Sequence, residues 1–248
     1  LTYCSIFEDS FSSEAAVAIA DVSPNALDEL VHRSLLHPIQ DGRYLIHEFV
    51  RTFVHSQPQN SASITLARQQ HAIYFAQLLD TIGRRKQGSI ENFQVLSQNL
   101  ADLCAAWTWM LEQCQFAYLR QSIEGFVYLH ERLGQLAEAS HLICEAIARV
   151  ETHITTLRTS TQETVESGNP VGSALALAEE TLADLHIFYA MLMEMMGDLA
   201  KTYQSAQIVF TYGKTLNIPR LEAHGAYLLA LQAQQLGQLN NAMEWVQQ

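Results

Sequence analysis

The stretch from Leu27 to Phe53 constrains the fold of this chain more than any other. Its first part carries apolar residues three or four positions apart, the spacing of an amphipathic helix. Its middle contains Asp41-Gly42, a favoured two-residue hairpin turn with alternating apolar residues after it. Its last part returns to helical spacing. The order helix, β-hairpin, helix predicts the core of a winged-helix domain.

The residues around this stretch complete a first predicted domain. Residues 2–20 predict two short helices, the second of them capped by Ser12 or Ser13. Ser23-Pro24 is typical of a helix start, because proline is tolerated in the first turn. A polar, proline-containing segment comes after the helix that ends the stretch, and it predicts a linker. We therefore place a winged-helix domain at residues 1–57.

Residues 62–248 predict only helices, one of them continuous over 93–111, together with a mobile loop at about 159–172. Three of these helices end in the same kind of turn. The turns are Leu133-Gly134-Gln135-Leu136, Met196-Gly197-Asp198-Leu199 and Leu236-Gly237-Gln238-Leu239. Glycine permits the left-handed turn between antiparallel helices, and a small residue five positions later lets the two helices approach closely.

These repeats predict tetratricopeptide-like helical hairpins with a period nearer forty residues than thirty-four. One hairpin cannot bury its apolar face alone, so the hairpins are expected to stack into an α-solenoid. The predicted fold class is mainly α: a small winged-helix domain followed by this solenoid at residues 62–248.

Composition indicates a globular protein of the cytoplasm. The 248 residues are 48% hydrophobic, with a mean hydropathy of 0.00. No apolar run reaches the roughly 18–20 residues that span a bilayer. The four cysteines show neither metal-ligand nor disulfide spacing, so we expect buried, reduced thiols. The chain starts without methionine inside an apolar run, and we expect it to be a fragment of a longer protein.

The charge argues against nucleic acid as a partner. The whole chain carries a net charge of −12, and residues 1–57 hold three basic residues against eight acidic ones. A winged helix that binds DNA needs lysine and arginine to neutralise phosphates. The alternative hypothesis, a stand-alone DNA-binding transcription factor with a repeat-based interaction domain, therefore has the charge against it.

No group of residues predicts catalysis or a metal site. Gly213-Lys214-Thr215 resembles the end of a phosphate-binding loop but lacks the earlier glycine and the strand. The ten histidines show no zinc-binding spacing. Glu179, Glu180 and Asp184 are typical of a solvated helix face without a basic partner. The methionines between 191 and 196 favour core packing, with a binding face as the alternative.

The tryptophan pair suggests a contact for a partner. Trp107 and Trp109 are separated by one residue, so both cannot face the same core. One is expected to pack between helices and the other to lie at a junction or an exposed groove, where a tryptophan is a good anchor. We take Trp109 as the candidate partner-binding residue.

Four segments resemble, in order, the second half of the STAND-class signalling ATPases, which include relatives of the maltose regulator and the NB-ARC proteins. The segments are LTYCSIFEDSFSSEAAVAIA, LDELVHRSLL, DGRYLIHEFVRTFV and DLCAAWTWMLEQ. In that family a nucleotide-binding module is followed by a winged helix and by tetratricopeptide-like repeats that sense a ligand or partner. The resemblance covers nearly the whole chain, and the hairpin-to-helix segment is its most specific part.

The resemblance implies a regulatory, non-enzymatic role. In the family, a histidine just after the hairpin contacts the phosphates of ADP and holds the off state. The matching residues here are Ile46-His47-Glu48, in place of Met-His-Asp. The other interpretation of His47 is a residue that only caps or pins the hairpin. ADP or ATP would act through an upstream module, so this chain holds no cofactor of its own. A protein partner or small inducer would bind the repeats, and the full-length protein could form oligomers.

Overall fold

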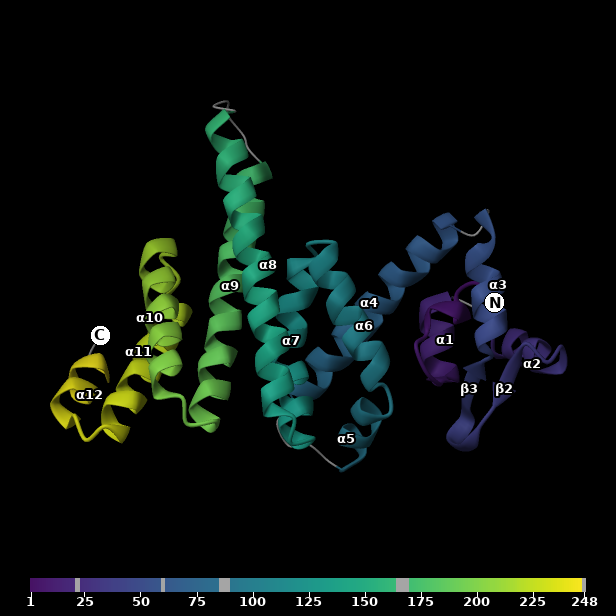
Figure 1. The fold of residues 1–248 in the computed structure, drawn as a ribbon, viewed down its shortest axis with the longest axis horizontal. Helices are drawn as coiled ribbons and strands as arrows, with labels where there is room; N and C mark the ends of the chain where they lie inside the picture. Colours follow the sequence, from purple (N-terminus) through teal and green to yellow (C-terminus); the bar gives the residue numbers. More distant parts are fainter. Residues whose placement is uncertain (21–22, 59–60, 85–89, 164–169, 247–248) are drawn as a thin grey trace. The chain divides into compact units, whose positions relative to one another are not determined.

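The structure is a computed structural model, and it describes residues 1–20, 23–58, 61–84, 90–163 and 170–246. These residues form twelve α-helices, two 3₁₀ turns and three short strands (Figure 1). The chain is therefore mainly helical with one small sheet, as its sequence predicts. Its contacts divide it into two compact units, Leu1–Gln113 and Cys114–Gln248.

The first unit contains the predicted hairpin. Its first elements are β1 (Phe11–Ser12), α1 (Ser13–Ala20), α2 (Pro24–His32), β2 (Leu36–Pro38), β3 (Arg43–Ile46) and α3 (Glu48–Ser56). The strands pair antiparallel in the order β1-β3-β2, with Leu36 opposite Ile46. Asp41 and Gly42 have φ angles of 60° and 67°, the left-handed conformation that a tight hairpin turn requires. The hairpin and the helix after it are confirmed, but the turn has three residues, Gln40–Gly42, and not the predicted two.

Two local predictions before the hairpin need correction. The first helix expected within residues 2–20 is only a 3₁₀ turn at Cys4–Ile6. The helix predicted from the apolar spacing of Leu27, Leu30, Val31 and Leu35 ends earlier, at His32, because Ser34 adopts a positive φ of 59° and turns the chain into β2. The cap prediction is confirmed for Ser12, whose hydroxyl accepts the Ala15 N–H at 3.1 Å.

The first unit continues with α4 (Ser61–Arg84), α5 (Ile90–Ser97) and α6 (Leu100–Glu112). The single helix predicted over 93–111 is wrong, because the chain breaks between α5 and α6. At the break, the Asn99 side-chain amide donates to the Val95 carbonyl at 2.6 Å, in competition with regular helix hydrogen bonds. The unit extends past the predicted linker because α4 packs against α1, and α6 against α4. The domains at 1–57 and 62–248 stay predictions.

The second unit is a series of helices that pack on one another in chain order. They are α7 (Phe116–Arg132), α8 (Leu136–Glu163), α9 (Pro170–Met195), α10 (Leu199–Leu216), α11 (Pro219–Gln235) and α12 (Leu239–Val246). Most of the loop predicted at 159–172 is helical, since α8 reaches Glu163 and α9 begins at Pro170. Residues 164–169 lie outside the described part of the chain.

The three predicted glycine turns are confirmed. Gly134, Gly197 and Gly237 have φ angles of 71°, 81° and 73°. After each glycine, the next N–H donates to the carbonyl five residues earlier at 2.8 Å, the hydrogen bond that closes a helix C-terminus. The small residues Ala139 and Thr202 are fully buried after the first two turns, as close helix packing requires.

Candidate functional site

His47 lies directly before α3 and caps it. Its backbone is extended, and its ring Nδ1 accepts the Phe49 N–H at 3.2 Å. The ring also stacks almost parallel on the Phe49 ring, with centroids 5.3 Å apart. Because Nδ1 is an acceptor here, the neutral ring carries its proton on Nε2. His47 is exposed, so this N–H is a donor available beside a helix N-terminus.

Trp109 lies in α6 and is half-buried, whereas Trp107, two residues earlier, is 1% exposed. The two rings therefore differ in environment, as their spacing predicts. Trp109 as a partner anchor stays a prediction.

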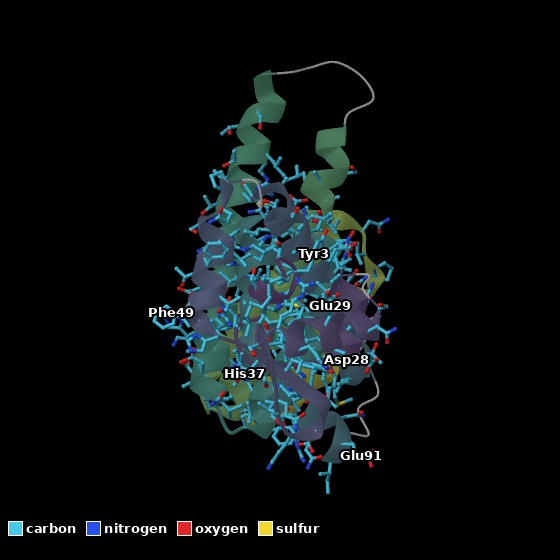
Figure 2. The ribbon with its side chains drawn as sticks, turned by 90° about the vertical axis from the view of Figure 1, so that its right-hand side faces the viewer. Tyr3, Asp28, Glu29, His37, Phe49 and Glu91 are labelled. Atoms are coloured by element: carbon cyan, nitrogen blue, oxygen red, sulfur yellow. The ribbon has the colours of Figure 1, made fainter. Side chains whose placement is uncertain are left out.

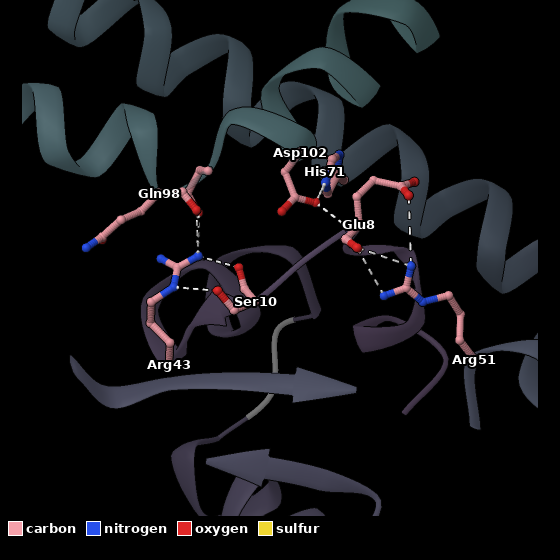
Figure 3. A network of polar contacts seen from close by, with 8 residues as sticks. Glu8, Ser10, Arg43, Arg51, His71, Gln98 and Asp102 are labelled. Carbon is pink, nitrogen blue, oxygen red and sulfur yellow. Dashed lines mark hydrogen bonds and ion pairs between the residues drawn. The ribbon is translucent and has the colours of Figure 1, made fainter. Parts of the chain in front are cut away.

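Arg43, the only basic residue of the hairpin, points into the first unit and is 7% exposed. Its Nε donates to the Ser10 hydroxyl at 3.0 Å, and its Nη2 donates to the Ser10 carbonyl. Nη2 also donates to the Gln98 carbonyl at 3.1 Å and to the Asn99 side-chain oxygen at 3.0 Å. Arg43 thus joins the sheet to the break between α5 and α6 (Figure 3).

A second polar connection joins the segment before β1 to α4 and α6. The fully buried Asp102 accepts two hydrogen bonds on one carboxylate oxygen (Figure 3). One comes from the His71 Nε2 at 2.8 Å and the other from the Glu8 backbone N–H at 2.9 Å. His71 is 4% exposed and packs against the rings of Phe7 and Phe75. Sequence reasoning missed this pair, because its members are 31 residues apart and no local pattern relates them.

Arg51 extends the connection to α3. Its guanidinium donates to the Glu8 carbonyl at 3.4 Å and lies 3.6 Å from the Glu48 carboxylate, in the first turn of the same helix. A continuous set of polar contacts therefore runs from the start of α3, next to His47, through Glu8 and Asp102 to His71 on α4. We call this set the Asp102 network; it consists of Glu8, Glu48, Arg51, His71 and Asp102.

The sequence predicts that the acidic residues of α9 form a solvated face without basic partners. This prediction is wrong. Glu179 and Asp184 are each 8% exposed. Ion pairs between 2.6 and 2.9 Å connect Arg120 with Glu180 and Asp184, Arg158 with Glu179, and Arg220 with Asp184. These arginines come from α7, α8 and α11, so the carboxylates hold four helices of the second unit together.

A groove of about 490 Å³ lies in the second unit beside α10 and α12. Amide side chains and aromatic rings line it, which suits a ligand with both polar and apolar parts. Its lining includes Gln204, Gln207, Thr211, Phe210 and Trp245. The Phe210 and Trp245 rings meet edge to face with centroids 5.1 Å apart.

Several other predicted features differ in the structure. Gly213 of the phosphate-loop mimic is buried within α10, in a helix and not in a loop. Of the four thiols, only Cys4 is buried, so the expectation of buried cysteines is wrong for Cys114 and Cys144, which are exposed. Core packing is likewise wrong for most of the methionine run, since only Met193 is buried.

The described residues bring no three His, Cys, Asp or Glu side chains together as metal ligands. Within the same residues, none of the helices has the length and hydropathy needed to cross a membrane.

Comparison with known proteins gives one distant likeness. No family model and no curated protein sequence matches the chain. Among solved structures, the chain is similar to a STAND protein with a tetratricopeptide repeat sensor from Pyrococcus horikoshii. The identity is 16% and the TM-score 0.27, over 98% of this chain and 48% of the other. The chain thus spans about half the length of that structure. A TM-score this low indicates only a distant relationship and assigns no function to this chain.

Proposed function

We propose that this chain is the non-catalytic, cytoplasmic regulatory part of a STAND-type signalling ATPase. In this proposal the first 57 residues are a winged helix that couples nucleotide state to a tetratricopeptide-like sensor at residues 62–248. The main observation in support of this proposal is the order of elements around the sheet. Helices α1 and α2 lie between β1 and β2, the strand order is β1-β3-β2, and α3 follows β3. This order is the one expected of a winged helix.

His47 is the nucleotide-sensing residue of the proposal. Its position at the start of α3 supports the role that the family resemblance implies, because a helix N-terminus favours phosphate oxygens. Its Nδ1 is already occupied by the Phe49 N–H. The Nε2–H is therefore the group that would donate to a phosphate held by an upstream nucleotide module.

The Asp102 network gives the coupling a physical basis. A movement of α3 at its N-terminus also moves Arg51, which contacts both Glu8 and Glu48. The Glu8 backbone N–H in turn donates to Asp102 on α6. We therefore expect the winged helix and the helices α4 and α6 to respond to nucleotide as one body.

Within the proposed sensor at residues 62–248, the second unit would bind the ligand. Its stacked helical hairpins and the groove beside α10 support binding of a protein partner or a small inducer. Such a ligand shifts the switch only if it binds one of the two states more tightly than the other.

The DNA-binding alternative has no observation in its favour. Of the three arginines in residues 1–57, Arg43 is buried in the first unit. Arg33 pairs with Glu29 at 2.5 Å, and Arg51 contacts Glu8 and Glu48. None of them is placed to neutralise a phosphate without losing a partner. A DNA titration at low salt tests this alternative directly.

The proposal is tested in the protein that includes the coding region upstream of Leu1. We expect that region to encode a phosphate-binding loop, and the purified protein to retain ADP. His47→Ala should release ADP at least tenfold faster, whereas His37→Ala, at another exposed histidine of the hairpin, should not. An upstream region without a nucleotide module, or equal ADP release from both variants, would refute the proposal.

A further inference from the structure

The groove beside α10 and α12 is lined by aromatic rings and neutral polar groups. Among the residues that the structure describes, all those that line it are uncharged. They include Phe210 and Trp245, whose rings meet edge to face. A third ring can add to such a pair by offset stacking or by another edge-to-face contact. The groove therefore suits a ligand that carries an aromatic ring.

The polar groups of the groove are available to a ligand. Gln204 and Gln207 lie one turn apart on α10, and within the described part of the chain neither side-chain amide forms a hydrogen bond. The Trp245 indole N–H is likewise without an acceptor among those residues. The Thr211 hydroxyl, in contrast, donates to the Gln207 backbone carbonyl at 2.8 Å. Because an amide side chain both donates and accepts, the two glutamines can bind an amide or a hydroxyl group of a ligand.

A lysine without an acidic partner lies next to the groove. The Lys214 Nζ is 4.3 Å from the centre of the Phe210 ring, and Lys214 follows Phe210 by one turn of α10. The other lysine that the structure describes, Lys201, is paired with Asp198 at 3.1 Å. Lys214 forms no ion pair with any described residue. Its ammonium group can therefore pair with an anionic group of a ligand whose ring lies against Phe210.

The rest of the chain offers an anion little attraction. Its net charge is −12, and carboxylates such as those of Asp28, Glu29 and Glu91 are exposed (Figure 2). These charges repel a small organic anion. A preference for an anionic ligand over its neutral analogue would therefore report a specific cation and not the general charge of the surface. A single lysine matches the one negative charge of a carboxylate better than the several charges of a nucleotide.

We propose that this groove binds a small aromatic carboxylic acid that also carries an amide or hydroxyl group. Its ring packs on Phe210 and Trp245, and its carboxylate pairs with Lys214. Its amide or hydroxyl group bonds to Gln204 or Gln207. The volume of about 490 Å³ is within the range of small-molecule sites. The inference names the ligand class of the sensor, so its regulatory meaning rests on the proposed function.

The test uses the full 248-residue chain and two probes, N-acetyl-4-fluorophenylalanine and its uncharged carboxamide. Fluorine NMR titrations follow the binding of each probe. We expect the acid to bind at least about fivefold more tightly than the carboxamide, because only the acid pairs with Lys214. Lys214→Gln should reduce the affinity for the acid to that for the carboxamide. Trp245→Leu should weaken the binding of both probes at least about fivefold, since each carries the ring.

Lys201→Gln is the matched control, because Lys201 lies on the same helix and is paired with Asp198. This variant should bind the acid as the wild type does. The proposal is overturned if the wild type binds neither probe or binds both equally, or if the preference for the acid persists in Lys214→Gln. Unchanged binding in Trp245→Leu also overturns it, because the site would then lie outside the groove. A peptide ending in phenylalanine that binds at least tenfold more tightly than the acid would overturn it by assigning the groove to a protein C-terminus.

The probes are added without nucleotide, so their binding does not depend on ADP release from the His47 variants. If the chain binds the acid but no nucleotide module lies upstream, the ligand site stands and only its place in a STAND-type switch is lost. Faster ADP release from His47→Ala together with no binding of either probe would refute the ligand site alone.

Discussion

Two glycines set how closely α10 and α11 can approach. A Cβ atom on Gly225 would lie 2.5 Å from the Phe210 backbone nitrogen, and one on Gly213 would lie 2.2 Å from the Glu222 nitrogen. The obstructing atoms belong to the backbone, so a side chain cannot simply move aside. This close contact, not a phosphate-binding role, explains the glycine of the Gly213-Lys214-Thr215 sequence.

We expect Gly225→Ala to destabilise the protein by about 2–3 kcal/mol, because the added methyl group forces the two helices apart. Gly172→Ala is the matched control. No atom lies within 4 Å of a Cβ at Gly172, and alanine there should be neutral or stabilise by up to about 1 kcal/mol. Urea unfolding curves measure both effects. Equal stability of the two variants would contradict the packing argument.

His186 makes the second unit sensitive to acid. Burial lowers the pKa of His186 from 6.5 to about 4, and its Nδ1 contacts the Ser205 hydroxyl at 3.2 Å. The unfolded chain therefore takes up a proton as the pH falls below 6.5, whereas the native state does so only near pH 4. Stability is full above pH 6.5 and is lost progressively as the pH falls toward 4.

Between pH 7.5 and pH 5, we expect His186 to account for a loss of about 2 kcal/mol in unfolding free energy. His186→Gln should remove that part of the loss, because the amide does not titrate. His141→Gln is the control, since the His141 side chain is 68% exposed. Burial also lowers the pKa of His130, and this adds the same acid sensitivity to the wild type, to His186→Gln and to His141→Gln. A pH dependence unchanged in His186→Gln would contradict this prediction.

At the scale of elements, Asp102 connects α6 to α4 and to the segment before β1. Replacement by alanine leaves the His71 Nε2 and the Glu8 N–H buried without their acceptor. We expect Asp102→Ala to cost about 3 kcal/mol or more. Asp102→Asn keeps an oxygen acceptor in the same place and should cost about 1 kcal/mol or less.

Chemical unfolding of the two Asp102 variants checks this difference. Equal losses would mean that the charge of Asp102 matters more than its position as an acceptor. Hydrogen exchange of the Glu8 amide gives a second measurement. Its protection should fall in the alanine variant and persist in the asparagine variant.

The sequence could predict those elements whose cause is local. The Asp41-Gly42 hairpin and the three glycine turns need residues that accept a positive φ, and such residues are visible in the chain. The sequence could not predict which face of α3 is buried. Phe49 and Phe53 have the same spacing as Val50 and Val54, so periodicity predicts a helix but does not say which pair lies inside.

The ion pairs of α9 show the same limit over a longer distance. Asp184 meets Arg120 and Arg220, which are 64 and 36 residues away in the sequence. Which arginine reaches which carboxylate depends on how the helices stack, and a pattern within one helix does not contain that information. For the same reason, the sequence contained no sign of the Asp102 network. His47 was named through the family resemblance, and its role in a site stays a prediction.

At the scale of the whole molecule, each of the two compact units buries large apolar side chains. Phe7, Phe75 and Trp107 are buried in the first unit, whereas Val209 and Leu229 are buried in the second. The contacts of the chain divide it into these two units. We therefore expect the chain to unfold in two steps, and not in one cooperative transition.

The distribution of tryptophans allows the two steps to be followed separately. Trp107 and Trp109 belong to the first unit and Trp245 to the second. In a Trp245→Phe background, tryptophan fluorescence reports the first unit alone, while far-UV circular dichroism reports both.

Gly225→Ala should shift only the unfolding step of the second unit, which circular dichroism detects and tryptophan fluorescence does not. Asp102→Ala should shift the fluorescence step instead. If either substitution moved both signals together, the two units would form a single cooperative structure, because destabilising one core would then unfold the other.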